Sequence, residues 1–234
     1  MKKGFLLLAI VLLCGGMTFA AESESKGIYV TGNIPSGYVD DSTKPDGVIE
    51  GEDPVLKLDG VWYYIRIAES GDQNPTYTDS LWQGAKSING YSSDSDRKSV
   101  DITHTDANNG VDSLIVMYGV FASLNDADLA PSVSISISTD GWRPENSGSV
   151  VDTISLLLDT AGLTTVQQDG GPQLTGAESG NTLHVARTDG NNATGTINPV
   201  QPVGYTVVTW GPAEGKVPVA GDYVADISIT IEKN

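Results

Sequence analysis

Hydrophobic and polar residues alternate strictly in two segments of the chain. In residues 132–138, serines alternate with Val133, Ile135 and Ile137. Near the end of the chain, polar residues such as Asp226 and Ser228 alternate with an apolar series: Tyr223, Ala225, Ile227, Ile229 and Ile231. A period of two places one series on a buried face and the other toward solvent. Both segments therefore predict β-strands with one buried and one solvent-exposed face.

Other parts of the chain predict further strands and few helices. Residues 61–67 are rich in β-formers, and residues 114–121 are apolar in both phases, which indicates a central strand covered on both faces. Further strands are expected at 27–34, 54–58, 98–104, 150–158, 182–187 and 204–210. Turn signals such as Asp140-Gly141 separate them, and the polar, Gly-rich stretches 36–53 and 159–181 predict loops. No long stretch shows helical periodicity, so we expect an all-β, immunoglobulin-like antiparallel sandwich of about ten strands with little or no helix.

The N-terminal residues predict an export signal ahead of one domain. Lys2 and Lys3 precede an apolar stretch, and Thr18 and Ala20 are small residues at the two positions that a signal peptidase reads, so residues 1–20 resemble a secretory signal peptide. Cys14 is the only cysteine, and Leu13 precedes it where lipoprotein signals carry a small residue, which argues against a lipid anchor. We divide the rest into an N-terminal extension, 21–35, and a single sandwich domain, 36–234.

The charge balance excludes one class of partner. The chain has 234 residues, with 30 Asp and Glu against 13 Lys and Arg, for a formal net charge of −17. Nucleic acid would be repelled by this charge, so it is not an expected partner. Charged residues make up only 18% and hydrophobic residues 39% of the chain, which argues for a folded domain and against disorder.

No pattern of residues predicts catalysis. His104 and His184 both fall on the polar phase of predicted strands, which indicates surface histidines. The chain has no paired zinc-type histidines and no nucleophile elbow. We therefore expect neither an enzyme nor a bound cofactor.

Two features support a binding module as an alternative. Trp82 and Trp142 lie in polar, loop-like contexts, where an exposed ring could stack on a sugar. Two pairs of aspartates, in each of which one residue separates the two carboxylates, are weak Ca²⁺ candidates: Asp94 with Asp96, and Asp126 with Asp128. Neither pair completes a calcium-binding loop. This alternative is a monomeric, secreted, carbohydrate- or calcium-binding sandwich.

The two ends of the chain carry a family resemblance. Residues 26–35 read KGIYVTGNIP, in which Ile28, Val30, Gly32 and Ile34 share one face and Pro35 ends the strand. Residues 218–232 form an alternating closing strand. Behind a signal peptide, these two segments resemble subunits of chaperone–usher fimbriae, and most of all the cysteine-free, colonization-factor-type pilins.

The resemblance implies a function in assembly. Subunits of this family are incomplete immunoglobulin-like sandwiches, and the N-terminal strand of the next subunit fills the open groove. Carried over, the donor face would be Ile28, Val30, Gly32 and Ile34. The groove on the last strand would be lined by Tyr223, Ile227, Ile229 and Ile231. The expected partners are copies of this or a related subunit, a periplasmic chaperone and an usher. The expected destination is the cell surface, reached through the periplasm.

Overall fold

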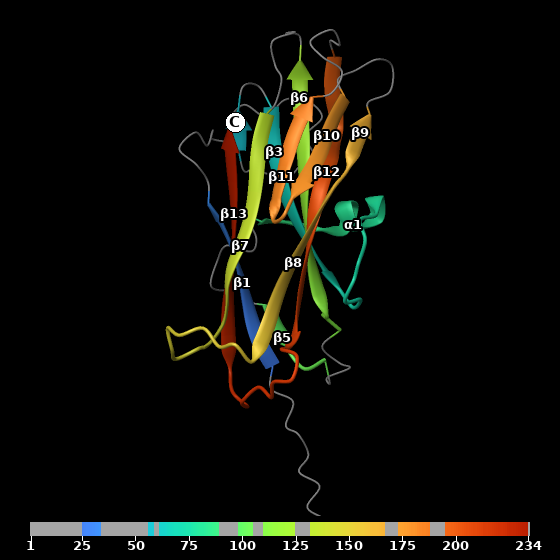
Figure 1. Cartoon of the computed structure of the whole chain (residues 1–234). Coiled ribbons are helices and arrows are strands. Elements are labelled where there is room, and N and C mark those ends of the chain that lie inside the picture. The colour runs from blue at the N-terminus through green and yellow to red at the C-terminus, as the bar shows by residue number, and fades with distance from the viewer. Residues whose placement is uncertain are drawn as a thin grey trace, which may run out of the picture.

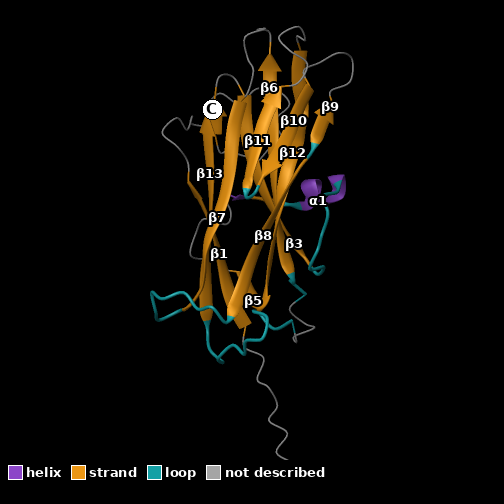
Figure 2. Cartoon of the chain, in the orientation of Figure 1, coloured by secondary structure: helices purple, strands orange, loops and turns teal. Residues whose placement is uncertain are grey.

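The protein is built from two β-sheets packed face to face. The computed structural model describes residues 25–33, 56–58, 61–88, 98–104, 110–124, 132–166, 173–187 and 195–233. Strands run along the long axis of the molecule in both layers (Figure 1), and the described residues contain a single short helix (Figure 2). None of the described helical residues forms a segment long and apolar enough to cross a membrane. The predicted all-β sandwich is confirmed, and ten of its strands have four or more residues.

The first sheet, sheet A, has seven strands. In spatial order they are β5 (Lys98–Asp101), β1 (Ser25–Asn33), β13 (Tyr223–Lys233), β7 (Ser132–Pro144), β11 (Thr182–Arg187), β10 (Gln173–Ser179) and β9 (Thr164–Val166). Neighbouring strands are antiparallel except β1 and β13, which are parallel. The last strand of the chain therefore lies inside the sheet, with the first described strand beside it.

The second sheet, sheet B, has six strands. In spatial order they are β2 (Leu56–Leu58), β3 (Val61–Ser70), β6 (Ser113–Leu124), β12 (Gly195–Pro212) and β8 (Ile154–Gly162), and β4 (Lys86–Ser87) also pairs with β3. Consecutive strands often belong to different sheets, as immunoglobulin-like connectivity requires.

The main core fills the space between the sheets. Strand β6 is covered on both faces, as its apolar sequence predicts. Val116 and Tyr118 belong to the main core, whereas Ile115 and Met117 belong to a second cluster on the outer face of sheet B. The serine-alternating segment of β7 also behaves as predicted, with Val133, Ile135 and Ile137 at most 3% exposed.

The outer cluster is covered by a segment that the sequence does not predict. Residues 71–85 cross sheet B and contain the helix α1 (Asp79–Gly84), which begins where the Thr78 side chain accepts a hydrogen bond from the Leu81 N–H. From α1, Trp82 packs into the outer cluster, and the Arg66 guanidinium lies 4.6 Å from the Trp82 ring centroid and donates to the Trp82 backbone carbonyl. Burial lowers the pKa of Arg66, and the nearby Tyr77 offsets this in part.

Two local predictions are wrong. Residues 159–181 do not form one loop, because they include the end of β8 and the strands β9 and β10. Asp140-Gly141 does not end β7, which continues to Pro144. Instead, the register against β13 shifts at this point, and Gly141 adopts a φ of 85°, a left-handed value that favours glycine. The dipeptide therefore forms a β-bulge inside a strand.

A buried chain of hydroxyl groups joins three strands of sheet B. Tyr118 Oη lies 2.9 Å from Thr206 Oγ1, which in turn lies 2.9 Å from Thr160 Oγ1. Burial raises the pKa of Tyr118 well above the ordinary 10.0, and the hydrogen bond with Thr206 offsets this only in part. The neutral phenol is thus the form that the folded protein holds.

This arrangement predicts a loss of stability at alkaline pH. Because the pKa of Tyr118 is raised on folding, its contribution is complete below pH 10.0 and is lost as the pH rises toward the folded-state value. We expect the unfolding free energy to fall with a slope steeper by up to about 1.4 kcal/mol per pH unit in the wild type than in Tyr118→Phe. Guanidinium unfolding at intervals between pH 8 and pH 11 measures both slopes. Equal slopes in the two proteins would contradict the prediction.

Candidate functional site

The candidate site is the place where β1 lies between β13 and β5. Strand β1 follows β13 in parallel along sheet A (Figure 1), and seven residue pairs, from Gly27 with Val224 to Asn33 with Thr230, define the register. Ile28 is aligned with Ala225, Val30 with Ile227, and Gly32 with Ile229. The predicted donor positions on β1 are thus in register with alternate residues of the last strand.

On β13, the residues predicted to line a groove are buried. Ile227 and Ile229 are 0% exposed, Ile231 is 2% and Tyr223 is 5%. All four belong, together with Ala225, to the main core. Tyr223 stands at the start of the strand, and its hydroxyl donates to the Val219 carbonyl over 2.6 Å. The alternating face of β13 therefore forms part of the core next to β1.

On its other side, β1 pairs with β5. Four pairs from Ser25 with Asp101 to Ile28 with Lys98 form an antiparallel ladder. Val100 in β5 is fully buried and belongs to the main core. Sequence patterns give no signal for this neighbour, because strand order depends on the tertiary arrangement. The fourth donor residue, Ile34, lies outside the described residues, as do the predicted signal peptide and the loop 36–53.

The two candidate tryptophans for sugar stacking are not on the surface. Trp82 is 6% exposed in the outer cluster, and Trp142 is 0% exposed in the main core. The prediction of an exposed, loop-like context is therefore wrong for both. For Trp142 the reason is the bulge at Asp140-Gly141: its extra residue shifts the alternation of β7 by one, so the ring turns to the core. For Trp82 it is the packing of the 71–85 segment against sheet B.

The weak calcium candidates fall outside the described residues. Asp94, Asp96, Asp126 and Asp128 are not described. Within the described part of the chain, no three residues among His, Cys, Asp and Glu come together in a way that could hold a metal ion.

The two histidines differ in their surroundings. His184 is exposed, as predicted, and its Nδ1 lies 3.0 Å from Ser134 Oγ. The surface prediction is wrong for His104, whose side chain is 16% exposed. Its Nδ1 lies 3.0 Å from Asp112 Oδ1, and its Nε2 lies 2.7 Å from the Trp210 carbonyl oxygen. His104 thus ties its own segment to those of Asp112 and Trp210.

One small hollow lies beside α1. Its volume is about 270 Å³, and it is lined by parts of β3 and α1 and by Lys86 of β4: Ile67, Ala68, Glu69, Ser80, Leu81, Gly84 and Lys86. The hollow is smaller than the clefts that enclose most small-molecule ligands. It has no cluster of catalytic groups, so it adds no argument for a small-molecule site.

Comparisons with known proteins assign neither a family nor a function to this chain. No family model matches the chain, and no curated protein and no solved structure is similar to it at a significant level. The fold defines an all-β sandwich protein.

Proposed function

We propose that the chain is an exported structural or adhesive surface protein whose copies assemble by exchanging the N-terminal strand β1. The observation that carries the proposal is the pairing of β1 with the last strand, in a register that sets Ile28, Val30 and Gly32 against the buried series of β13. In the exchanged form, β1 of one copy would occupy this position in the next copy.

The place of β1 in the chain supports exchange. It is the first described strand, so it can leave sheet A without any other strand being threaded through the sheet. Residues 34–55, 22 in number, connect it to β2. A connection of this length spans up to about 70 Å when extended, which is enough to reach a neighbouring copy. The pairing made in exchange would be the same as that made within one chain, so little free energy separates the two forms.

The sequence supports the cellular setting of the proposal. The signal-like N-terminus fits export, and the resemblance to chaperone–usher subunits suggests a periplasmic chaperone and an usher as assembly partners. The buried positions of Trp82 and Trp142 remove the main argument for a monomeric carbohydrate-binding module.

The proposal is tested by the heat stability of assemblies. Envelope extracts of producing cells, run on a denaturing gel with and without boiling and probed for this chain, should show multimers that collapse to monomer on boiling. We expect Val30→Asp to abolish the multimers, because it sets a charge against the buried Ile227. Thr31→Asp, aligned with the partly exposed Ser228, should retain them.

Two results would contradict strand exchange. One is a wild-type chain that runs as monomer in both lanes. The other is a Val30→Asp chain with an undiminished ladder. Circular dichroism of the purified variants shows whether each retains the sandwich, so loss of the ladder in a folded Val30→Asp protein is attributable to assembly.

A further inference from the structure

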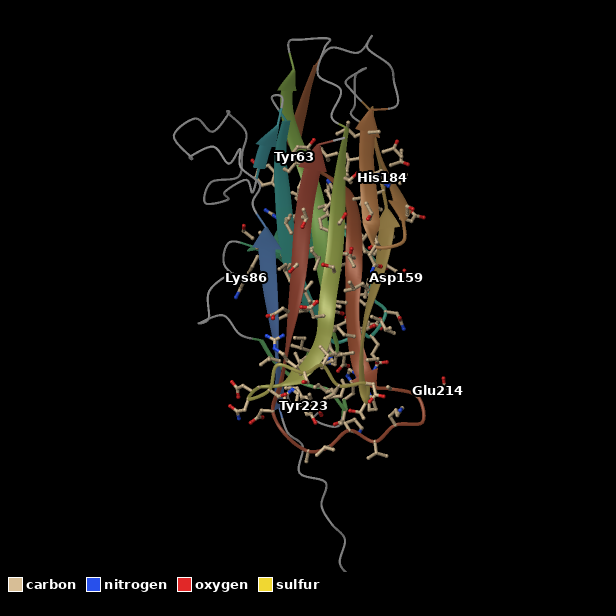
Figure 3. The ribbon with its side chains drawn as sticks, turned by 60° about the vertical axis from the view of Figure 1, so that its left-hand side comes forward. Tyr63, Lys86, Asp159, His184, Glu214 and Tyr223 are labelled. Carbon is tan, nitrogen blue, oxygen red and sulfur yellow. The ribbon has the colours of Figure 1, made fainter. Side chains whose placement is uncertain are left out.

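Strand β8 is the longest exposed edge among the described strands. Sheet A ends in β5, which has four residues, and in β9, which has three. On sheet B, β2 has three residues, β4 has two, and β8 has nine. In Figure 3, Lys86 of β4 and Asp159 of β8 mark opposite sides of the molecule, consistent with their places at the two margins of sheet B. Natural sandwiches keep exposed edges short or irregular, because a long edge offers unpaired backbone groups to another chain.

The edge of β8 lacks the features that usually block such pairing. Its register with β12 runs without a shift from Ile154 to Gly162, so no bulge interrupts it. The strand has no proline and a single charged residue, Asp159. At the end of the strand, the Gly162 N–H donates to Glu178 Oε2 of sheet A over 3.2 Å. No described strand pairs with the second side of β8. This side is therefore a regular edge along which another strand could pair.

The side chains of β8 leave apolar surface exposed along this edge of sheet B. Leu157 is 62% exposed on the outer face, one of the few large apolar side chains exposed in the described structure. Its neighbours Leu156 and Leu158 are only partly buried against the core, whereas Leu114 and Val116 of the central strand β6 are fully buried. An apolar residue exposed on an unpaired edge is typical of an interaction surface.

We propose that β8 pairs antiparallel with β8 of a second copy of this chain, about a two-fold axis at Leu157. In this register Leu157 faces its own counterpart, Leu156 faces Leu158, and Asp159 faces Ser155. The exposed leucines cover each other, and no carboxylate stands opposite a carboxylate. A register centred on Asp159 would set two negative charges together, whereas the Leu157 axis sets the most exposed leucine of the strand against its own copy.

The pairing joins the two B sheets into one continuous sheet. It uses a different surface from β1, so it does not depend on strand exchange. The net charge of −17 on each copy opposes association, and added salt should strengthen the dimer by screening that repulsion. The second copy is the favoured occupant because the pattern of β8 complements itself.

Cysteine cross-linking tests the register. The chain has one cysteine, Cys14, within the predicted signal peptide, so the exported form offers a cysteine-free background. Residues directly opposite on antiparallel strands have Cα atoms about 4.5–5.5 Å apart, a separation that a disulfide spans. We expect Leu157→Cys to form a disulfide-linked dimer at least about ten times faster than Val217→Cys, which is 85% exposed in the loop after β12 and outside the paired strand. Equal rates would overturn the proposal.

Sedimentation equilibrium tests the affinity. The wild type should dimerise in a concentration-dependent manner, more tightly at higher salt, and Leu157→Asp should raise the dissociation constant at least about tenfold. Val217→Asp adds the same charge outside the paired strand and should leave the constant within about twofold. Because Leu157 is mostly exposed, Leu157→Asp should keep the wild-type thermal midpoint when measured as monomer. A wild type that stays monomeric up to about 1 mM would overturn the dimer.

The two assembly proposals fail separately. Val30→Asp should leave the β8 dimer intact, and Leu157→Asp should leave the heat-labile ladder intact. If Leu157→Asp removed the ladder and Val30→Asp did not, the β8 edge would account for the multimers in place of strand exchange.

Discussion

Replacing Gly176 with alanine should lower the free energy of unfolding by about 3 kcal/mol, at the upper end of the usual cost of overpacking. A Cβ at Gly176 would lie 2.0 Å from the Val203 carbonyl oxygen and 2.9 Å from Leu183 Cδ1. Val203 belongs to β12, so the clash falls between the backbones of the two sheets. Gly162 has the matching contact, since its Cβ would lie 2.0 Å from the Gly176 carbonyl oxygen. The sheets can approach at this margin only because these positions lack side chains.

The backbone hydrogen bonds explain why the clash cannot relax. Gly176 N–H donates to the Leu163 carbonyl, and Leu163 N–H donates to the Val203 carbonyl, each over 2.9 Å. Moving β10 away to admit a methyl group would break this connection. Thermal unfolding should show a midpoint lower by about 6–12 °C.

A matched substitution controls for the general effect of glycine replacement. Gly148→Ala has no atom within 4 Å of the added Cβ and should change the free energy of unfolding by less than about 0.5 kcal/mol. If Gly176→Ala were as stable as Gly148→Ala, the close approach of β10 and β12 would be wrong.

Replacing Trp142 with alanine should lower the free energy of unfolding by about 4 kcal/mol, the usual cost of removing a large aromatic side chain from a core. Trp142 is 0% exposed and is among the largest fully buried side chains of the described structure. The ring packs in the main core between the sheets, where its removal would leave a cavity.

Two further variants separate volume from other causes. Trp142→Phe should lower the free energy of unfolding less than Trp142→Ala, because a phenyl ring still fills most of the space of the indole. The buried indole N–H also has no hydrogen-bond partner in the described structure to lose. Val217→Ala removes an apolar side chain that is 85% exposed and should change stability by less than about 0.5 kcal/mol. Chemical denaturation of the three proteins measures these differences. A Trp142→Ala protein as stable as Val217→Ala would place the ring on the surface, as its sequence context predicts.

Part of the candidate site follows from local sequence. The alternation at 223–231 predicts which side of β13 is buried, and the structure confirms it with Ile227, Ile229 and Ile231 in the core. The pattern at 27–34 predicts a strand, and β1 is described over Ser25–Asn33. Neither pattern identifies β13 and β5 as the neighbours of β1, because the pairing joins residues nearly 200 positions apart for β13 and at least 70 positions apart for β5. The donor role of β1 stays a prediction.

The errors have a common physical origin in contacts between distant segments. Trp142 is buried although its sequence context predicts an exposed loop, because one bulge residue reverses the alternation of β7, and nothing in the neighbouring sequence separates a bulge from a turn at Asp-Gly. His104 occupies a polar position in its segment, yet Asp112 and the backbone of Trp210 engage its ring. Trp82 is buried because a connecting segment folds over the outer face of sheet B.

The sequence by itself determined the fold class, the strands with one solvent-exposed face and the central strand that is buried on both faces. These features depend on the period of apolar residues, which acts within each strand whatever its neighbours are. The tertiary structure alone decided which strands are neighbours and which of them form an edge. It also decided where the sheets approach through Gly162, Gly176 and Gly204, and which polar-context side chains are buried. These outcomes depend on contacts between segments far apart in the chain, and local residue patterns do not encode such contacts.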